Sequence, residues 1–250
     1  MIIVQISDTH IQAQVPWARS RLEDLARTVA SINALRPRPA AVLHTGDIAH
    51  DAAPSDYAAA RAALSRLACP VYATVGNRDR RASFRDAFAS EGYLEGDSCF
   101  VQFAVNLGAA RIVSVDTLDA ESKLGGFCTE REVNLRRLLT ACPGQPTLVF
   151  LHHAPVAVPD LPGSPLQFRD PRRAAALVRC LTQCSGVIGV VAGHVHCART
   201  VALGSVMLST VPSIATDLSK EKLPDRHVGR PIYHLHTIDG AHISGASILV

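Results

Sequence analysis

The stretch Ala41-Val-Leu-His-Thr-Gly-Asp-Ile48 contains the features that decide the fold. Its apolar run from Ala40 to Leu43 is typical of a buried strand, and Gly46 allows a sharp turn where the strand ends. Asp47 therefore stands at the carboxyl end of a strand, where open α/β sheets place their ligand crevices. An acid on a rigid strand end suits a metal ligand, although an aspartate that only caps the backbone amides of a turn would look the same. The side chains at the other strand ends decide between the two.

The composition limits the class of protein. The length of 250 residues is within the range of one α/β unit, so we expect a single domain over residues 1–250. A hydrophobic fraction of 48% with only 5% aromatic residues is typical of strands that are covered on both faces. The formal net charge of +3 provides no basic block, so no nucleic acid polymer is expected as a partner.

The sequence also bears on where in the cell the protein is expected. No apolar run approaches the ~18 residues of a membrane helix, and the first residues lack the pattern of a signal peptide, so no membrane partner is expected. Seven cysteines without paired spacing indicate reduced thiols and a cytoplasmic protein.

Strands and helices alternate along the first half of the chain. We expect strands at Ile2–Ile6, Ala41–His44 and Val71–Val75, and helices at Ser20–Leu35, Pro54–Leu67 and Ser83–Ala89. Ser55 is the expected N-cap of the second helix.

The second half is richer in strands. They are expected at Phe100–Val105, Arg111–Val115, Thr147–Leu151, Val187–Ala192, Arg199–Leu203, Val206–Ser209, Ile232–His236 and His242–Leu249. One helix should begin at a capping box of Thr129 and Glu132, and another at Asp170-Pro171. Because strands outnumber helices late in the chain, we expect two sheets. The segments Pro155–Pro165 and Asp217–Arg230 are expected to be functional loops.

Five expected strand ends carry side chains of the kind that bind metals. They are Asp8 with His10, Asp47, Asn77, His152, and His194 with His196. Residues two apart in an extended segment point the same way, so each Asp-x-His or His-x-His pair can hold one ion. Each piece alone is ambiguous, but five pieces directly after apolar strands indicate one shared site.

The donor set indicates two ions. Seven oxygen and nitrogen donors are too many for one tetrahedral zinc, but they suit two ions if one carboxylate bridges them. Asp47 is the natural bridge, since no other acid follows it before Asp51. The mixture of imidazole, carboxylate and amide favours manganese, iron or zinc. Two ions about 3.5–4 Å apart form a clamp for phosphate ester hydrolysis, in which water held between them becomes the nucleophile.

In order along the chain, these motifs resemble those of the calcineurin-like metallophosphoesterase superfamily. They are Asp-x-His, Gly-Asp, Gly-Asn, a histidine before a proline-containing turn, and Gly-His-x-His, over residues 7–196. The compact length and the form Ile6-Ser-Asp-Thr-His10 resemble the class III cyclic nucleotide phosphodiesterases and related glycerophosphodiesterases.

The resemblance implies a fold and a ligand set. The fold is a four-layer αββα sandwich of two mixed β-sheets flanked by helices, with a dinuclear metal site at the strand ends. One ion would be held by Asp8, His10, Asp47 and His196, and the other by Asp47, Asn77, His152 and His194. A homodimer is expected from the family alone.

The sequence departs from the family at Arg78, where a histidine usually follows the asparagine. Arginine stays charged and cannot act as a general acid, but it can bind phosphoryl oxygens bidentately. We therefore expect Asp47, Asn77 and Arg78 to act in catalysis, with Asn77 and Arg78 on the substrate phosphate. The alternative is a surface arginine that pairs with Asp79.

The other histidines have weaker functional readings. His50 is expected to line the substrate pocket, and His227 in the charged loop is the best outside candidate for a substrate contact. His153 and His44 are expected to be structural, and His234 and His236 to belong to the core or to a sheet edge.

We conclude that the chain is expected to be a metal-dependent phosphodiesterase acting on a cyclic nucleotide or a glycerophosphodiester. The alternatives are a phosphomonoesterase or broad phosphoesterase of the same fold, and a catalytically silent binding scaffold. A scaffold would be expected to lose ligands, whereas all seven are present.

Overall fold

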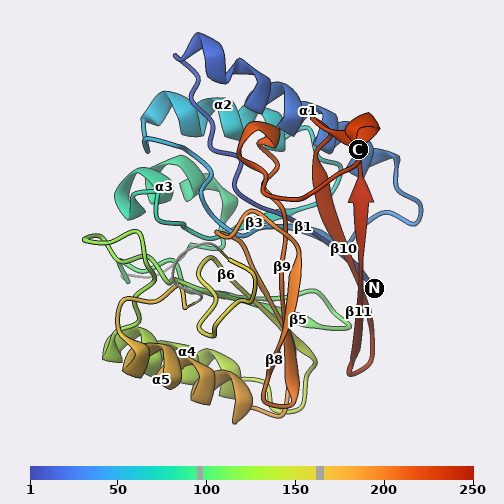
Figure 1. The fold of residues 1–250 in the computed structure, drawn as a ribbon. Coiled ribbons are helices and arrows are strands. Elements are labelled where there is room, and N and C mark those ends of the chain that lie inside the picture. The colour runs from blue at the N-terminus through green and yellow to red at the C-terminus, as the bar shows by residue number, and fades with distance from the viewer. Residues whose placement is uncertain (95–97, 162–165) are drawn as a thin grey trace.

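Two mixed β-sheets lie face to face between two layers of helices in the computed structural model, which describes residues 1–94, 98–161 and 166–250 (Figure 1). The first sheet has the order β11 (His242–Leu249), β10 (Ile232–Asp239), β1 (Ile2–Ile6), β2 (Ala41–His44) and β3 (Val71–Ala73). The second has the order β4 (Ala104–Asn106), β5 (Arg111–Val115), β6 (Thr147–Leu151), β7 (Val187–Ala192), β9 (Val206–Thr210) and β8 (Arg199–Leu203). The expected αββα sandwich is confirmed.

The helices divide between the two outer faces (Figure 1). The first sheet is covered by α1 (Arg19–Ala34), α2 (Pro54–Leu64) and α3 (Arg81–Phe88), and the second by α4 (Thr129–Thr140) and α5 (Pro171–Thr182). Short 3₁₀ turns occur at Pro16–Ala18, Ala89–Glu91, Thr216–Leu218 and Asp225–His227. No helix in the described ranges is long and apolar enough to cross a membrane.

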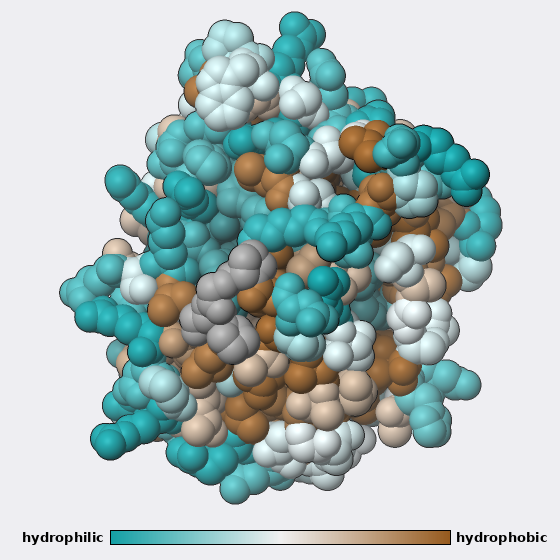
Figure 2. All heavy atoms as spheres, viewed as in Figure 1, coloured by the Kyte–Doolittle hydropathy of each residue, from teal (hydrophilic) through white to brown (hydrophobic). Residues whose placement is uncertain are grey.

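The apolar strands are explained by burial on both faces. Along β6, Leu148 and Phe150 belong to the hydrophobic cluster between the sheets, whereas Val149 and Leu151 belong to the cluster under α4 and α5. Neighbouring residues of a strand point to opposite faces, so an uninterrupted apolar run is what a sheet with two buried faces requires. In Figure 2 the hydrophobic atoms that remain visible gather in the middle of the molecule, over the strands.

Strand directions bring one set of strand ends to a common edge. β1, β2 and β3 are parallel to one another, and so are β5, β6, β7 and β9. The antiparallel strands lie on the margins, with β10 and β11 beside β1, and with β4 and β8 at the outer edges. The segments after β1, β2, β3, β6 and β7 are therefore free to form one site.

Two predicted helix caps were wrong. Ala53 is the N-cap of α2 and Pro54 its first residue, so Ser55 is already inside the helix and makes no cap. Thr129 is likewise the first residue of α4, after the N-cap Cys128, and no capping box forms. Glu132 instead contacts Arg136 one turn later at 3.1 Å. The Asp170 cap is confirmed, because its carboxylate accepts a hydrogen bond from the amide of Arg172 at 2.8 Å.

Several boundaries also differ from the predictions. α2 ends at Leu64 rather than Leu67, and β3 stops at Ala73. β4, at Ala104–Asn106, contains only the last two residues of the strand expected at Phe100–Val105. The loop Asp217–Arg230 contains short 3₁₀ turns, and part of the expected loop Pro155–Pro165, residues 162–165, lies outside the described residues.

Candidate metal centre

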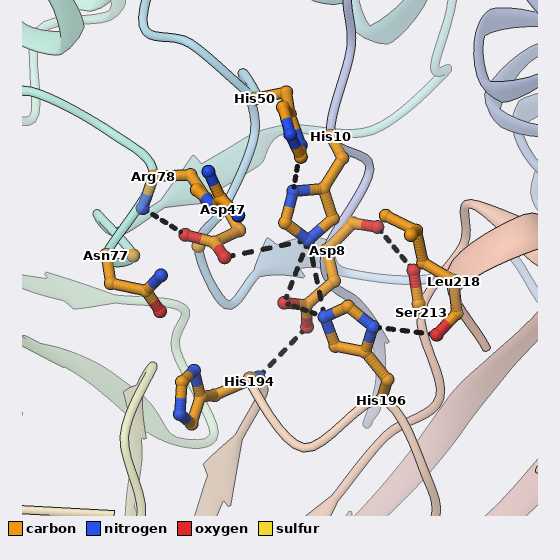
Figure 3. Close-up of polar contacts among 12 residues, drawn as sticks. Asp8, His10, Asp47, His50, Asn77, Arg78, His194, His196, Ser213 and Leu218 are labelled. Carbon is orange, nitrogen blue, oxygen red and sulfur yellow. Dashed lines mark hydrogen bonds and ion pairs between the residues drawn. The ribbon is translucent and has the colours of Figure 1, made fainter. Parts of the chain in front are cut away.

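Backbone hydrogen bonds join the strand ends that carry the expected ligands. The amides of Asp8 and His10 donate to the carbonyls of Gly46 and Asp47, both at 3.0 Å, which ties the end of β1 to the end of β2. Between the sheets, the amide of His194 donates to Asp8 Oδ2 at 3.0 Å. Figure 3 shows the resulting ring of side chains around a common centre.

The backbone is strained where these ligands stand. Among the described residues, seven that are not glycine have a positive φ, and five of them are expected ligands. These five are Asp8, His10, Asp47, His194 and His196, with φ between 45° and 71°. Such conformations are uncommon for residues with a Cβ and cluster at functional sites.

The signature glycines make room for this convergence. A Cβ on Gly193 would stand 2.1 Å from Ser7 Oγ and 2.8 Å from Asp8 Oδ2. A Cβ on Gly76 would stand 2.2 Å from Asp47 Oδ1, and one on Gly46 would stand 2.7 Å from His152 Nδ1. These distances exclude any side chain, so each glycine is required by the close approach of a ligand.

His196 presents one ring nitrogen to a carboxylate. Its Nδ1 donates to the carbonyl of Leu218 at 2.8 Å, and a carbonyl can only accept. In the neutral ring, Nε2 is then an acceptor, yet it faces Asp8 Oδ1 at 3.2 Å. Asp8 Oδ1 is buried and accepts no hydrogen bond among the described residues. Burial would lower the pKa of His196, but the facing Asp8 outweighs burial and raises it. A proton or a cation therefore lies between the two atoms, and a nitrogen at which the two compete has the chemistry of a metal ligand.

His152 repeats the arrangement on the other side of the site. Its Nδ1 donates to the carbonyl of Thr45 at 2.7 Å, and its Nε2 faces Asp47 Oδ2 at 3.6 Å. The side-chain oxygen of Asn77 lies 3.2 Å from the same nitrogen.

Charge is concentrated in this space. Burial raises the pKa of Asp8, but the facing His196 and His10 outweigh it and hold that pKa well below its usual value. Asp8 therefore remains ionised although it is fully buried. Burial would lower the pKa of His152, but Asp47 and Asp8 outweigh burial and raise it to about 9.

Three groups of donors lie close enough to hold a metal ion. The ligand atoms of Asp8, His10 and His196 lie within 4.8 Å of one another, as do those of Asp8, Asp47 and His152. A third group consists of His152, His153 and His194. His153 was expected to be structural, and both of its ring nitrogens are engaged, by Thr117 Oγ1 at 3.0 Å and by the carbonyl of Lys123 at 3.2 Å.

His50 and His44 lie where the sequence predicted. His50 lines the cleft beside the site, and its Nδ1 contacts Nδ1 of His10 at 3.2 Å. Burial, with His10 and Arg78 nearby, lowers the pKa of His50 to about 4, so its imidazole is neutral. His44 is buried and contacts the hydroxyl of Thr9 at 3.0 Å.

Arg78 does not make the alternative surface pair with Asp79. The buried carboxylate of Asp79 accepts from the amides of Ile48, Ala49 and Gly76 and from the hydroxyl of Tyr57. The backbone amide of Arg78 donates to Asp47 Oδ1 at 2.7 Å, and its side chain lines the cleft. No ion pair involves this guanidinium within the described ranges, so it is available to an anion.

His227 is not brought into the cluster. In the described part of the chain its two ring nitrogens contact the guanidinium groups of Arg226 and Arg230, and Arg230 donates to the backbone oxygen of Val250. It is also absent from the described lining of the cleft beside Asn77.

Several supporting groups were missed by the sequence reading. They are Gln167, which contacts His194, Ser213, which donates to the carbonyl of Asp8, and the backbone carbonyls of Thr45 and Leu218. Carbonyl oxygens carry no signal in a sequence, and no motif surrounds Gln167 or Ser213.

A cleft of about 830 Å³ opens beside Asn77. Charged side chains of both signs dominate its wall, and Leu118 and Ala120 are its apolar members. The described lining comprises His50, Asp51, Asn77, Arg78, Asp79, Arg80, Arg81, Leu118, Asp119, Ala120, Glu121, Ser122 and Lys123. A groove of about 520 Å³ near His234 and His236 contains none of the expected ligands.

The chain belongs to the calcineurin-like phosphoesterase family, whose model matches residues 1–198. Family, fold and donor groups together support the use of divalent metal ions.

Two relatives by sequence and one solved structure are similar to this chain. The chain is 27% identical over 245 residues to the probable glycerophosphodiester phosphodiesterase of Arcobacter nitrofigilis. The alignment covers 94% of this chain and 88% of that protein. It is 27% identical over 201 residues to the 3′,5′-cyclic adenosine monophosphate phosphodiesterase of Escherichia coli K12, and the alignment covers 78% of this chain and 69% of that protein. A dimetal phosphatase structure from Danio rerio shares the fold, with a TM-score of 0.73 and 15% identity. The superposition covers 100% of this chain and 98% of that chain.

Proposed function

We propose that the chain hydrolyses small phosphodiesters with the help of two divalent cations. The contact between Nε2 of His196 and Oδ1 of Asp8 carries this proposal, because a ring nitrogen and a buried carboxylate face each other at 3.2 Å and can share a cation. His152 and Asp47 provide a second facing pair, and the carboxylate of Asp47 also lies 3.6 Å from Nε2 of His10. Manganese, iron or zinc suits this mixture of donors.

The ligand assignment is the one that the family resemblance implies. Asp8, His10, Asp47 and His196 would hold one cation, and Asp47, Asn77, His152 and His194 the other. When bound, the cations supply positive charge for the phosphoryl oxygens and make water a nucleophile near neutral pH. Because ligands from both halves of the chain are needed, we propose that residues 1–250 act as one domain.

Residues of the chain would orient the substrate. Arg78 has no ion partner among the described residues, and its planar guanidinium matches the geometry of two phosphoryl oxygens. Its backbone amide fixes one oxygen of Asp47, so this residue orients both a metal ligand and the substrate. His50 is neutral and lines the same wall, where an N–H can donate to the substrate. Arginine cannot protonate the leaving oxygen, so water is the proton donor in this proposal.

The cleft favours a polar leaving group. Nucleobases are commonly held by stacking on aromatic rings, and the described lining contains no phenylalanine, tyrosine or tryptophan. Its hydrogen-bonding side chains suit a glycerol-type alcohol, so we place a glycerophosphodiester ahead of a cyclic nucleotide as substrate. The relatives with these two activities make both substrates necessary in the test.

The test is a turnover panel on chelated protein that is reloaded with manganese, zinc or iron. Glycerophosphodiesters, cyclic AMP and bis-p-nitrophenyl phosphate are compared with a monoester. We expect metal-dependent turnover with diesters preferred. Preference for the monoester would favour the phosphomonoesterase alternative, and fewer than one bound ion per chain would favour a silent scaffold.

Location and assembly remain proposals as well. All seven cysteines are free, which agrees with a reducing compartment such as the cytoplasm. A homodimer is proposed from the family resemblance.

A further inference from the structure

The four expected ligand histidines differ in what holds their second ring nitrogen. Backbone carbonyls hold two of them, since His152 donates to Thr45 and His196 to Leu218. His10 contacts the side chain of His50. For His194 the partner of this nitrogen is a side-chain amide, because its Nε2 lies 2.8 Å from Oε1 of Gln167. A side-chain partner can be removed by substitution without disturbing the backbone.

We propose that Gln167 is a positioning residue that fixes the ring of His194 for metal binding, an inference that rests on the proposed function. The amide oxygen of Gln167 accepts the Nε2–H of His194, which leaves Nδ1 as the nitrogen with a free lone pair. The ring is also held between two others, with centroids 5.1 Å from His152 and 4.5 Å from His153. Partners of this kind orient ligand imidazoles and raise metal affinity.

Gln167 is itself held by a backbone clamp. The amide of Gly125 donates to the carbonyl of Gln167 at 2.8 Å, and the amide of Arg169 donates to the carbonyl of Gly125 at 3.0 Å. A Cβ on Gly125 would stand 2.7 Å from Cβ of His153 and 2.9 Å from Cε2 of Phe168. Only glycine lets the two segments approach this closely, so the position of Gln167 depends on residue 125.

The same clamp includes the wall of the substrate cleft. Arg169 contacts Glu121 at 3.1 Å and Asp119 at 3.5 Å, and both acids line the cleft. His153 Nε2 donates to the carbonyl of Lys123 at 3.2 Å. The cleft wall, Gln167 and the ring of His194 are therefore connected through hydrogen bonds. A substitution that releases Gln167 should affect the cation bound by His194 more than the cation bound by His196.

The experiment measures Mn²⁺ binding to chelated protein by calorimetry. Gln167→Leu removes the acceptor with little change in size, and we expect one of two binding steps to weaken by about 10- to 100-fold while the other changes less than about twofold. Gln167→Glu keeps an acceptor and should bind like the wild type or tighter. Gly125→Ala, with Gln167 intact, should reproduce the loss. Gln183→Leu, a change at an exposed glutamine away from the site, is the matched control.

Three results would overturn the proposal. Wild-type isotherms in Gln167→Leu would remove any role in metal binding, and a raised KM with an unchanged isotherm would assign Gln167 to the substrate. Equal weakening of both steps with a lowered Tm of the metal-free protein would show a general structural role. If the wild type binds fewer than one Mn²⁺ per chain, the proposed function is wrong, and the inference about Gln167 is wrong with it. If the wild type binds two, the variants test only the inference about Gln167.

Discussion

The pairs His194-Val-His196 and His234-Leu-His236 have the same spacing, and each follows or lies on a strand, yet their surroundings differ. His194 and His196 have φ values of 71° and 59°, whereas His234 and His236 lie on the regular strand β10. Nε2 of His196 faces a carboxylate oxygen that accepts no hydrogen bond in the described chain.

The second pair is chemically complete without a cation. His236 contacts the side-chain oxygen of Gln5 and His234 the hydroxyl of Ser247, both at 3.0 Å. Burial lowers the pKa of His236 to about 3 and that of His234 to about 4, so both rings are neutral. Spacing and burial are therefore common to a metal site and to a structural pair. Backbone strain and a facing carboxylate distinguish the first pair from the second.

The largest effect is expected from Asp47→Asn, because Asp47 is proposed to be shared by both cations. Asparagine keeps the size and can still accept from the amide of Arg78, but it lacks the charge. We expect turnover of bis-p-nitrophenyl phosphate to fall by about 10³-fold or more, with less metal bound per chain. Turnover within tenfold of the wild type would contradict the bridging role.

The second expectation compares two glycines, one beside each histidine pair. Gly193→Ala should lower activity by about 100-fold, because the new methyl group would collide with Ser7 and Asp8. At Gly245 the nearest atom to an added Cβ is Nδ1 of His236, at 3.5 Å, so Gly245→Ala should keep activity and metal content. Both variants are assayed together, and equal losses would show that the crowding at residue 193 has no special importance.

Arg78→Ala should lower kcat/KM for every diester by roughly 10- to 100-fold, as expected for charged hydrogen bonds to a phosphate. Arg78→His should retain or improve turnover of diesters with poor leaving groups, since imidazole can supply a proton. Arg38→Ala, at an exposed position outside the cleft, is the control. Kinetics of Arg78→Ala that match the wild type would refute the phosphate contact.

Metal affinity should rise with pH, by up to about tenfold per pH unit. In the cation-free protein burial would lower the pKa of His152, but Asp47 and Asp8 raise it to about 9. The proton and the cation compete for Nε2, so the apparent affinity should rise with pH from 6.5 to 8.5 and level off above 9. Calorimetry in two buffers of different ionisation enthalpy measures the released proton, and a pH-independent isotherm would contradict this competition.

The smallest effect on activity is expected from His236→Gln. This change should leave metal content intact and lower the free energy of unfolding by about 1–3 kcal/mol, because a buried hydrogen bond with Gln5 is disturbed. Denaturant unfolding of the metal-free protein measures the loss. Loss of metal from this variant would erase the distinction between the two pairs.

Much of the site could be predicted from the sequence because its parts are local. The apolar runs before Asp8, Asp47 and His152 predict strands, and parallel strands bring their carboxyl ends to one edge. Glycine before Asp47 and before His194 marks close approach, which is a property of a single position.

The remainder depends on contacts between distant residues. Nothing near Ile232–Asp239 indicates that β10 pairs with β1, and nothing near Gln167 indicates contact with His194. The caps predicted at Ser55 and Thr129 failed because the helix in each case starts one or two residues earlier than the pattern indicated. His227 was favoured for its type and its charged loop, and its contacts to Arg226 and Arg230 could not be read from either.

The number of cations per chain tests the account most directly. Chelated protein is loaded with manganese, and the bound metal is counted and located by anomalous diffraction. We predict two ions, one beside His10 and His196 and the other beside His152 and His194, with the Asp47 carboxylate between them. A single ion without contact to Asp47, or ions at His234 and His236 instead, would contradict it.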